Sequence, residues 1–242
     1  MKVQVLFTIP ETAGVDVAGA TVAVVDVLRA TSTMVTALAR GARAVFPSAS
    51  TEDALRLAQS LGREDTLLCG ERRGLRIQGY DLGNSPLEYT REVVEGRRLI
   101  MNTTNGTRAI LVMEDADAVL ALAFLNLGAV ASEVRERERL ICLCAGREDA
   151  FALEDAVCAG LLLQRLRAEG VELDPDDGAR AALALAQAHE PNEAFLASTL
   201  AGRALLASEL GADLAWCARV DALAVVPVLR DRMLVPLSEP EA

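Results

Sequence analysis

Aromatic residues are scarce in this chain of 242 residues, at 3% of the sequence, although hydrophobic residues make up 52%. The apolar material is therefore mostly alanine, leucine and valine, which suits helices packed on a buried parallel sheet better than an all-β sandwich. The five cysteines form no disulfide framework by number or spacing, and such cysteines are typically reduced, buried thiols.

Basic residues are also fewer than acidic ones. The 24 lysines and arginines stand against 35 acidic residues, a net charge of −11, and Lys2 is the only lysine. This balance argues against nucleic acid or an anionic membrane surface as a partner. The chain opens without a basic-then-apolar leader, and no apolar run approaches the roughly 20 residues of a membrane helix. We therefore expect a cytoplasmic protein without membrane contact.

Apolar runs that predict strands alternate with patterns that predict helices. The strand-like runs are residues 3–9, 21–27, 44–46, 66–69, 99–102, 118–123 and 140–145, and the helix-like patterns are 32–40, 51–61, 107–113 and 126–135. This alternation favours a three-layer α/β/α fold with a largely parallel or mixed sheet.

We expect a single compact α/β domain over 1–242. It would be subdivided into an α/β core (1–150), a mainly helical region (151–220) and a return to the sheet (221–237), with closing strands at 223–227 and 233–236. Within the core, a pattern of strand, loop, helix, strand, helix and strand recurs after about 75 residues. This offset favours a duplication, although two βα repeats with similar strand lengths produce the same pattern by chance.

The first candidate site follows the strand that ends at Asp26, where polar residues come at once: Arg29, Thr31, Ser32 and Thr33. Ligands of open parallel sheets bind beyond the carboxyl ends of the strands, so Asp26 is well placed for a site. The hydroxyls can cap the next helix, whose free N–H groups favour an anion. The alternative is that Asp26 is a turn residue and the hydroxyls are only caps.

Residues 102–108 form a second candidate anion cradle. Gly106 allows close backbone approach, and Arg108 can bind two phosphate oxygens. Thr104, Asn105 and Thr107 add hydroxyl and amide groups. A plain helix cap is the alternative here as well.

Two further strand exits carry carboxylates and arginines. Residues 70–86 contain four glycines, and their candidate site residues are Glu71, Arg72, Arg73, Arg76, Asp81, Asn84 and Ser85. The exit at 144–155 adds Arg147, Glu154 and Asp155. Loops this polar and rich in glycine commonly build a site. Together the loops predict a pocket for a small anion, with a phosphate ester as the favoured ligand.

Several known signatures of phosphate chemistry are absent. Leu28 stands where the haloacid-dehalogenase signature requires its second aspartate, and residues 102–108 lack the Gly-Lys-Ser/Thr of a nucleotide-binding loop. His189, the only histidine, lies in an acidic helical stretch, which gives little support to histidine-based catalysis. Neither Cys142 nor Cys144 begins the Cys-x5-Arg motif of thiol phosphatases. A metal-assisted mechanism remains.

Four segments together resemble the 2-phosphosulfolactate phosphatases, magnesium-dependent enzymes of the sulfolactate branch of coenzyme M synthesis. They are VDVLRATST at 25–33, GERRG and GYDLGNSP within 70–86, TTNGTRAI at 103–110, and CAG with ED within 144–155. The likeness runs in order from Asp26 to about Gly160, and the helical region beyond it carries no matching motif. The resemblance implies a compact α/β/α enzyme that uses Mg²⁺ to hydrolyse the phosphate ester of a 2-hydroxy acid.

The resemblance and the loops together lead to specific expectations. The metal candidates are Asp26, Glu71, Asp81, Asp155 and Glu154, and the catalytic candidates are Asp26, Arg29, Asn105 and Glu154. A carboxylate would activate water or attack directly. We expect a small anionic phosphate ester as the ligand and a homodimer as the candidate assembly. A phosphatase of another hydroxy-acid or sugar phosphate, and a non-catalytic anion-binding protein, stay open as alternatives.

The geometry of the sheet provides a check. The strands that close at Asp26, Cys69, Asn102 and Ala145 each lead into a polar or glycine-containing loop. We expect these four strand ends to converge on one cleft, which would bring together Arg29, Glu71, Asn105 and Glu154.

Overall fold

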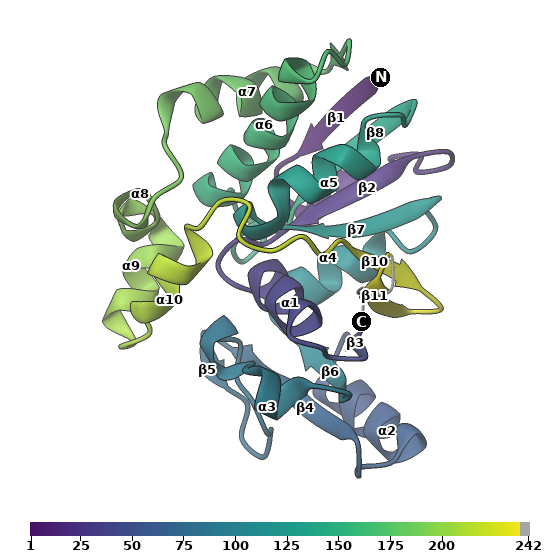
Figure 1. The fold of residues 1–242 in the computed structure, drawn as a ribbon, viewed down its shortest axis with the longest axis vertical. Coiled ribbons are helices and arrows are strands. Elements are labelled where there is room, and N and C mark those ends of the chain that lie inside the picture. Colours follow the sequence, from purple (N-terminus) through teal and green to yellow (C-terminus); the bar gives the residue numbers. More distant parts are fainter. Residues whose placement is uncertain (238–242) are drawn as a thin grey trace.

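Within residues 1–237, the part of the chain that the computed structural model describes, a mixed sheet of 11 strands forms the middle layer of the molecule (Figure 1). Helices cover the sheet on both sides, so the predicted three-layer α/β/α fold is confirmed. Residues 238–242 of the expected domain lie outside the described part.

Seven strands follow the apolar runs identified in the sequence. They are β1 (Lys2–Leu6), β2 (Thr21–Val25), β3 (Ala44–Pro47), β4 (Thr66–Arg72), β6 (Arg98–Asn102), β7 (Ala118–Leu122) and β8 (Arg139–Cys144). The remaining strands are β5 (Leu75–Arg76), β9 (Asp174–Pro175), β10 (Pro227–Arg230) and β11 (Met233–Pro236). The closing strand expected at 223–227 begins only at Pro227, because the residues before it run along the loop after β7, where the Leu223 N–H donates to the Leu125 carbonyl at 2.9 Å.

Two groups of parallel strands are joined by the antiparallel hairpin of β10 and β11. The strand order is β5-β4-β6-β3-β11-β10-β7-β2-β8-β1-β9. Three successive antiparallel pairings separate the groups: β7 with β10, β10 with β11, and β11 with β3. On either side of the hairpin, β3, β6 and β4 mirror β7, β2 and β8. The strands of the suspected repeat therefore occupy equivalent places in a pseudo-two-fold arrangement.

The helices predicted in the core are present. They are α1 (Ala30–Ala39), α2 (Thr51–Leu61), α4 (Gly106–Val112) and α5 (Leu127–Val134). Short helical turns add η1 (Ile9–Thr12), η2 (Pro86–Glu88), α3 (Arg91–Val94) and η3 (Phe124–Asn126). The start of α2 illustrates the local chemistry, since the Ser50 Oγ accepts a hydrogen bond from the Asp53 N–H at 3.1 Å and caps the first turn.

Strand β2 is buried along its whole length because both of its faces are covered. Val22 and Val24 belong to a core that includes residues of α1 and α4, whereas Ala23 and Val25 belong to the core beneath α5 and α6 (Leu153–Ala168). A strand buried on both faces is typical of parallel sheets between helical layers.

The helical region expected at 151–220 begins with α6 and continues with α7 (Asp177–Ala188), α8 (Glu193–Ser198), α9 (Leu200–Ala207) and α10 (Ala212–Cys217). α6 and α7 pack on the part of the sheet near β1, and α8, α9 and α10 lie together at the left of Figure 1. α10 contacts η2, so the helical region reaches the long loop after β4.

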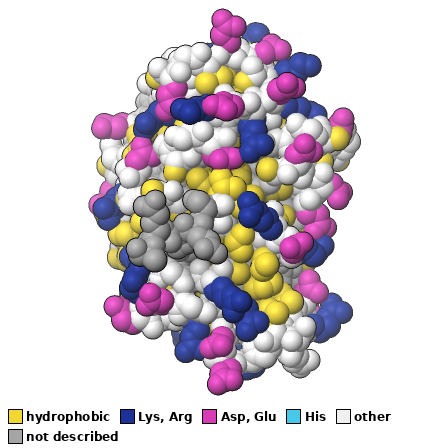
Figure 2. Space-filling model, turned by 45° about the vertical axis from the view of Figure 1, so that its right-hand side comes forward, with side chains coloured by type: hydrophobic (Ala, Val, Ile, Leu, Met, Phe, Trp, Pro, Cys, Tyr) yellow, Lys and Arg dark blue, Asp and Glu magenta, His cyan; other side chains and the backbone are white. Residues whose placement is uncertain are grey.

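The surface is mixed in charge. On the face drawn in Figure 2, lysine and arginine side chains are dispersed among acidic ones, with hydrophobic side chains exposed between them. In the described residues, no helix combines the length and the apolar character needed to span a membrane.

Candidate active site

The loops that follow β2, β4, β6 and β8 line one cavity of about 140 Å³. The lining residues at its polar end are Asp26, Arg29, Glu71, Arg73, Asn84, Thr104, Asn105, Arg147, Glu148, Glu154 and Asp155. The predicted convergence of four strand ends is confirmed. The two strand groups run in opposite senses along the pairing order, and the loops at their carboxyl ends nevertheless line the same cavity.

Asp26 lies at the centre of this arrangement and is 8% exposed. Its Oδ1 accepts a hydrogen bond from the Ala30 N–H at 3.1 Å, so the carboxylate caps the start of α1. Its Oδ2 faces Gly106, where an added Cβ would lie only 2.7 Å from that oxygen. The loop after β6 can approach Asp26 this closely because residue 106 has no side chain.

Two further carboxylates connect the loops through backbone hydrogen bonds. Glu71 accepts from the Gly74 N–H and from the Thr104 N–H, both at 2.7 Å. Asp155 accepts from the Val27 N–H at 2.8 Å and from the Gly146 N–H at 3.2 Å. Glu71 therefore joins the loops after β4 and β6, and Asp155 joins those after β2 and β8 to the first turn of α6.

The buried carboxylates disfavour one another's charge. Burial raises the pKa of Asp26 to about 7, and the nearby Glu71 and Glu154 add to the effect. Burial likewise raises the pKa of Glu154. Burial first, and then Asp26 and Glu154, hold the pKa of Asp155 well above its ordinary value. Such mutual destabilisation of negative charge is relieved by a proton or by a bound cation.

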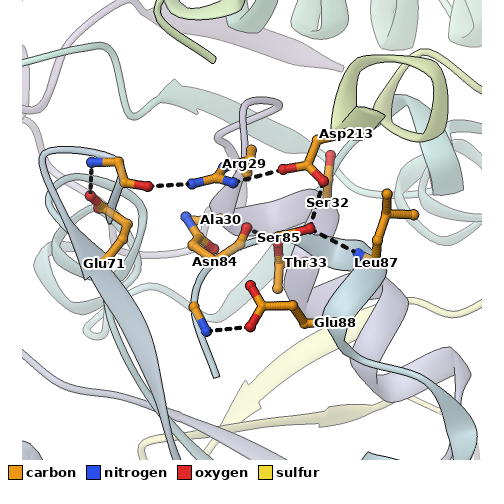
Figure 3. A network of polar contacts seen from close by, with 12 residues as sticks. Arg29, Ala30, Ser32, Thr33, Glu71, Asn84, Ser85, Leu87, Glu88 and Asp213 are labelled. Atoms are coloured by element: carbon orange, nitrogen blue, oxygen red, sulfur yellow. Dashed lines mark hydrogen bonds and ion pairs between the residues drawn. The ribbon is translucent and has the colours of Figure 1, made fainter. Parts of the chain in front are cut away.

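Arg29 is the buried cation of the site. Its Nη1 donates to Asp213 Oδ2 at 2.7 Å, and its Nη2 donates to the Gly74 carbonyl at 3.0 Å (Figure 3). Arg147 also lines the cavity, and its Nη1 donates to the Leu200 carbonyl at 2.8 Å. Both guanidinium groups are thus held by protein acceptors while they retain N–H groups that can bind an anion.

Several polar atoms at the cavity are buried without a protein partner. They are Asn84 Oδ1, Thr104 Oγ1 and Asn105 Oδ1. Buried polar atoms are almost always hydrogen-bonded, so these three indicate contacts to a ligand or to ordered water.

Other predicted binding residues have structural roles. The Thr31 Oγ donates to the Asp26 carbonyl at 2.8 Å, Ser32 to the Val27 carbonyl at 2.8 Å, and Thr33 to the Asn84 carbonyl at 2.9 Å. These hydroxyls stabilise the loop after β2 and do not line the cavity. Thr107 is buried and exchanges hydrogen bonds with Thr103, which caps α4.

Four charged candidates lie outside the cavity. Arg108 is 46% exposed and its Nη1 lies 3.6 Å from Asp149 Oδ1. Asp81 accepts from the Leu68 N–H at 2.7 Å and pairs with an arginine on the surface. Arg72 and Arg76 are exposed. A strand-to-loop position was their only sequence signal, and a long loop directs only some of its side chains inward.

The site also contains residues that the sequence did not reveal. Asp213 on α10 pairs with Arg29 and accepts from the Ser85 Oγ at 2.6 Å. One wall of the cavity belongs to α9 and the turn after it, with Ala201, Ala204, Leu205 and Ser208. A lone aspartate in the apolar run LGADLAWC was the available signal, and the small residues of α9 offered none.

The oxygen donors at the cavity suit Mg²⁺, which usually takes only a few of its ligands from the protein. No group of three metal-ligating side chains in residues 1–237 is arranged as a complete coordination site. Mg²⁺ commonly needs only one or two carboxylates, with waters and phosphate oxygens completing its shell. Asp26, Glu71 and Glu154 offer such oxygens beside the unpartnered polar atoms, so the residues present fit the ion.

Comparison with known proteins agrees with this picture. Residues 7–232 match the family described as 2-phosphosulpholactate phosphatase, so the likeness extends through the helical region, well beyond Gly160. A probable 2-phosphosulfolactate phosphatase of Synechococcus sp. (strain JA-3-3Ab) is 44% identical over 208 residues, 84% of this chain and 86% of that protein.

Two further relatives carry the same name. The protein of Thermotoga petrophila is 38% identical over 210 residues, 86% of this chain and 88% of its own length. The protein of Symbiobacterium thermophilum is 38% identical over 224 residues, 92% of this chain and 96% of its own length. The chain therefore belongs to the 2-phosphosulfolactate phosphatase family, a family of phosphoric monoester hydrolases.

Proposed function

We propose that the protein uses Mg²⁺ to hydrolyse the phosphate monoester of a small 2-hydroxy acid, with 2-phospho-3-sulfolactate as the first candidate substrate. The main support for the proposal is that one cavity is lined by four buried carboxylates and by two arginines whose guanidinium groups are hydrogen-bonded to the protein. These residues are Asp26, Glu71, Glu154, Asp155, Arg29 and Arg147. The names of the relatives supply the substrate class.

The charge of the cavity supports a cation-dependent reaction. Five carboxylates and three guanidinium groups line it, so it carries an excess of negative charge when all of these groups are ionised. A phosphate ester with a further acidic group would be repelled from such a surface. Mg²⁺, when bound, would neutralise charge on the phosphate and on the carboxylates, which is the main requirement of phosphoryl transfer.

Asp26 is the favoured metal-holding residue, together with Glu71 or Glu154. Asp26 uses one oxygen to cap α1 and directs the other to the loop after β6. Glu71 and Asp155 each accept backbone hydrogen bonds on both oxygens, and Asp155 is the less suited because it is the more deeply buried of the two.

The remaining residues have separate roles in the proposed reaction. Arg29 and Arg147 bind the anionic groups of the substrate, and Thr104 and Asn105 contact the phosphate end. Water adds its oxygen to phosphorus while the hydroxy acid leaves as the alcohol. Glu154 or Asp26 takes a proton from that water and returns it to the departing oxygen as the bond from phosphorus to that oxygen breaks, and attack by a carboxylate itself is the alternative.

A phosphate-release assay tests the function. The purified protein is incubated with Mg²⁺ or with a chelator, and with 2-phosphosulfolactate, phospholactate, phosphoglycerates and a sugar phosphate. We expect turnover that requires Mg²⁺, with a phosphorylated 2-hydroxy acid as the best substrate. A preference for the sugar phosphate would indicate a phosphatase that acts on a different class of substrate. Tight phosphate binding without turnover would instead indicate an anion-binding protein.

A further inference from the structure

Asp213 connects the helical region to the site. It is 2% exposed, and its two carboxylate oxygens accept from Arg29 Nη1 at 2.7 Å and from Ser85 Oγ at 2.6 Å (Figure 3). We propose that Asp213 is a positioning residue that orients the Arg29 guanidinium toward the bound anion, so that α10 is a working part of the active site. This inference rests on the proposed function.

The contacts of Asp213 continue across the cavity. Arg29 Nη2 donates to the Gly74 carbonyl at 3.0 Å, and the Gly74 N–H donates to Glu71 at 2.7 Å. Glu71 in turn accepts from the Thr104 N–H at 2.7 Å. An uninterrupted chain of polar contacts therefore runs from α10 through Arg29 to the loops that follow β4 and β6.

Two acceptors from different elements determine how the guanidinium lies. The group is planar, so fixing Nη1 on Asp213 and Nη2 on Gly74 sets both its position and its plane. Arg29 is also a lining residue of the cavity. Its remaining N–H groups can therefore bind an anion without first being ordered, which lowers the entropy cost of reaching the reactive geometry.

Ser85 holds Asp213 from the other side. Its Oγ donates to Asp213 and accepts from the Leu87 N–H at 3.3 Å, at the start of η2. Because the two oxygens of Asp213 have different partners, the carboxylate cannot rotate without losing one of them. Ser85, predicted from the sequence to bind substrate, does not line the cavity and contacts Asp213 instead.

Removing one partner of a buried ion pair leaves the other charge buried and unpaired, which lowers the stability of the fold. The test therefore has to separate an effect on positioning from an effect on stability. Asp213→Asn keeps the shape and the acceptor oxygen but removes the charge that orients Arg29. Asp221→Asn is the matched control, because Asp221 pairs with Arg165 at 2.5 Å on the surface, outside the cavity. Ser85→Ala is a milder second variant that leaves the ion pair in place.

Steady-state phosphate release is measured for these variants, for Arg29→Ala and for the Arg29→Ala, Asp213→Asn double variant. For Asp213→Asn we expect kcat to fall about tenfold or more while KM changes less than about threefold. Ser85→Ala should show a smaller loss of kcat, and Asp221→Asn none. The double variant should match Arg29→Ala within about twofold, because Asp213 acts through Arg29. Losses that multiply in the double variant would overturn the proposal.

Hydrogen exchange of the peptide covering residues 70–78 provides a readout independent of activity. Asp213→Asn, or Ser85→Ala if the first variant does not fold, should speed exchange in this peptide and leave α6 unchanged. Wild-type exchange in both variants would overturn the positioning role. Absence of turnover by the wild-type protein on every ester would refute the proposed function, while the exchange result would still decide the role of Asp213.

Discussion

Asp26 shows how the surroundings of one carboxylate prepare it for chemistry. Its backbone and one of its oxygens are used to form the turn into α1, since its N–H donates to Thr31 and its Oδ1 accepts from Ala30. The other oxygen faces the loop after β6. The residue is thus both a turn residue and a candidate reactive group, and the two interpretations considered from the sequence are compatible.

Replacing Asp26 by Asn should abolish turnover and change the free energy of unfolding of the metal-free protein by no more than about 1 kcal/mol. The amide can still accept from the Ala30 N–H, and it removes a charge that Glu71 and Glu154 disfavour. Phosphate release and thermal unfolding check this. Asp81 lies outside the cavity, so Asp81→Asn is the control and should retain the kcat of the wild type. Full activity in Asp26→Asn would remove Asp26 from the mechanism.

Position 106 requires glycine because neighbouring atoms leave no room for a side chain. A Cβ at this position would lie 2.4 Å from the Ala30 Cβ and 2.7 Å from Asp26 Oδ2. Gly106→Ala should therefore lower the free energy of unfolding by about 1–3 kcal/mol, the usual cost of overpacking, and should reduce kcat by displacing Asp26. Adding Ala30→Gly removes the nearest clash and should recover part of both losses. Wild-type stability in Gly106→Ala would show that the loops can separate at no cost.

At the scale of elements, a hydrogen bond joins the loop after β8 to the start of α9. Arg147 donates to the carbonyl of Leu200, the first residue of that helix, and also lines the cavity. Arg108, at the start of α4, is exposed beside Asp149 and does not reach the cavity. The sequence made both arginines candidates for binding the anion, and it gave the more specific role, the binding of two phosphate oxygens, to Arg108.

Arg147→Lys should lower kcat/KM by about fivefold or more, because a lysine cannot both reach the Leu200 carbonyl and present a forked donor to the substrate. Arg108→Lys should leave kcat/KM within about twofold of wild type. Steady-state kinetics on the two variants in parallel measures the difference. A larger loss in Arg108→Lys than in Arg147→Lys would mean that the loop after β6 closes over the substrate during turnover.

At the scale of the whole molecule, the cavity concentrates negative charge between two groups of strands. Burial raises the pKa of Asp26 from its ordinary value of 3.8 to about 7. The raised value means that the protonated form favours the folded state. Its contribution to stability is complete below about pH 4 and is lost as the pH rises through about 7.

Mg²⁺ should reverse this trend, because it competes with protons for the same oxygens. The increase in Tm on adding Mg²⁺ should be larger at pH 8 than at pH 6, and thermal unfolding with and without chelator at both values measures it. In Asp26→Asn the difference between the two pH values should shrink. An equal increase in Tm at both pH values would argue against metal binding by these carboxylates.

The layered fold, and the location of the site at the carboxyl ends of the strands, could both be predicted from the sequence. Apolar runs such as 22–25 predict strands buried on both faces, and each strand that leads into a polar loop places candidate site residues at its own carboxyl end. Asp26, Glu71, Asn105 and Glu154 could be identified on this basis because strand ends are local features.

Tertiary packing determines which polar residues face the cavity and which further residues complete it. Thr31, Ser32 and Thr33 donate to backbone carbonyls and do not line the cavity, and Arg108 is exposed. Asp213 comes from a helix 184 residues beyond Arg29. Nothing local in an apolar helix specifies such a partner, because the contact arises from how the helical region packs against the loop after β4.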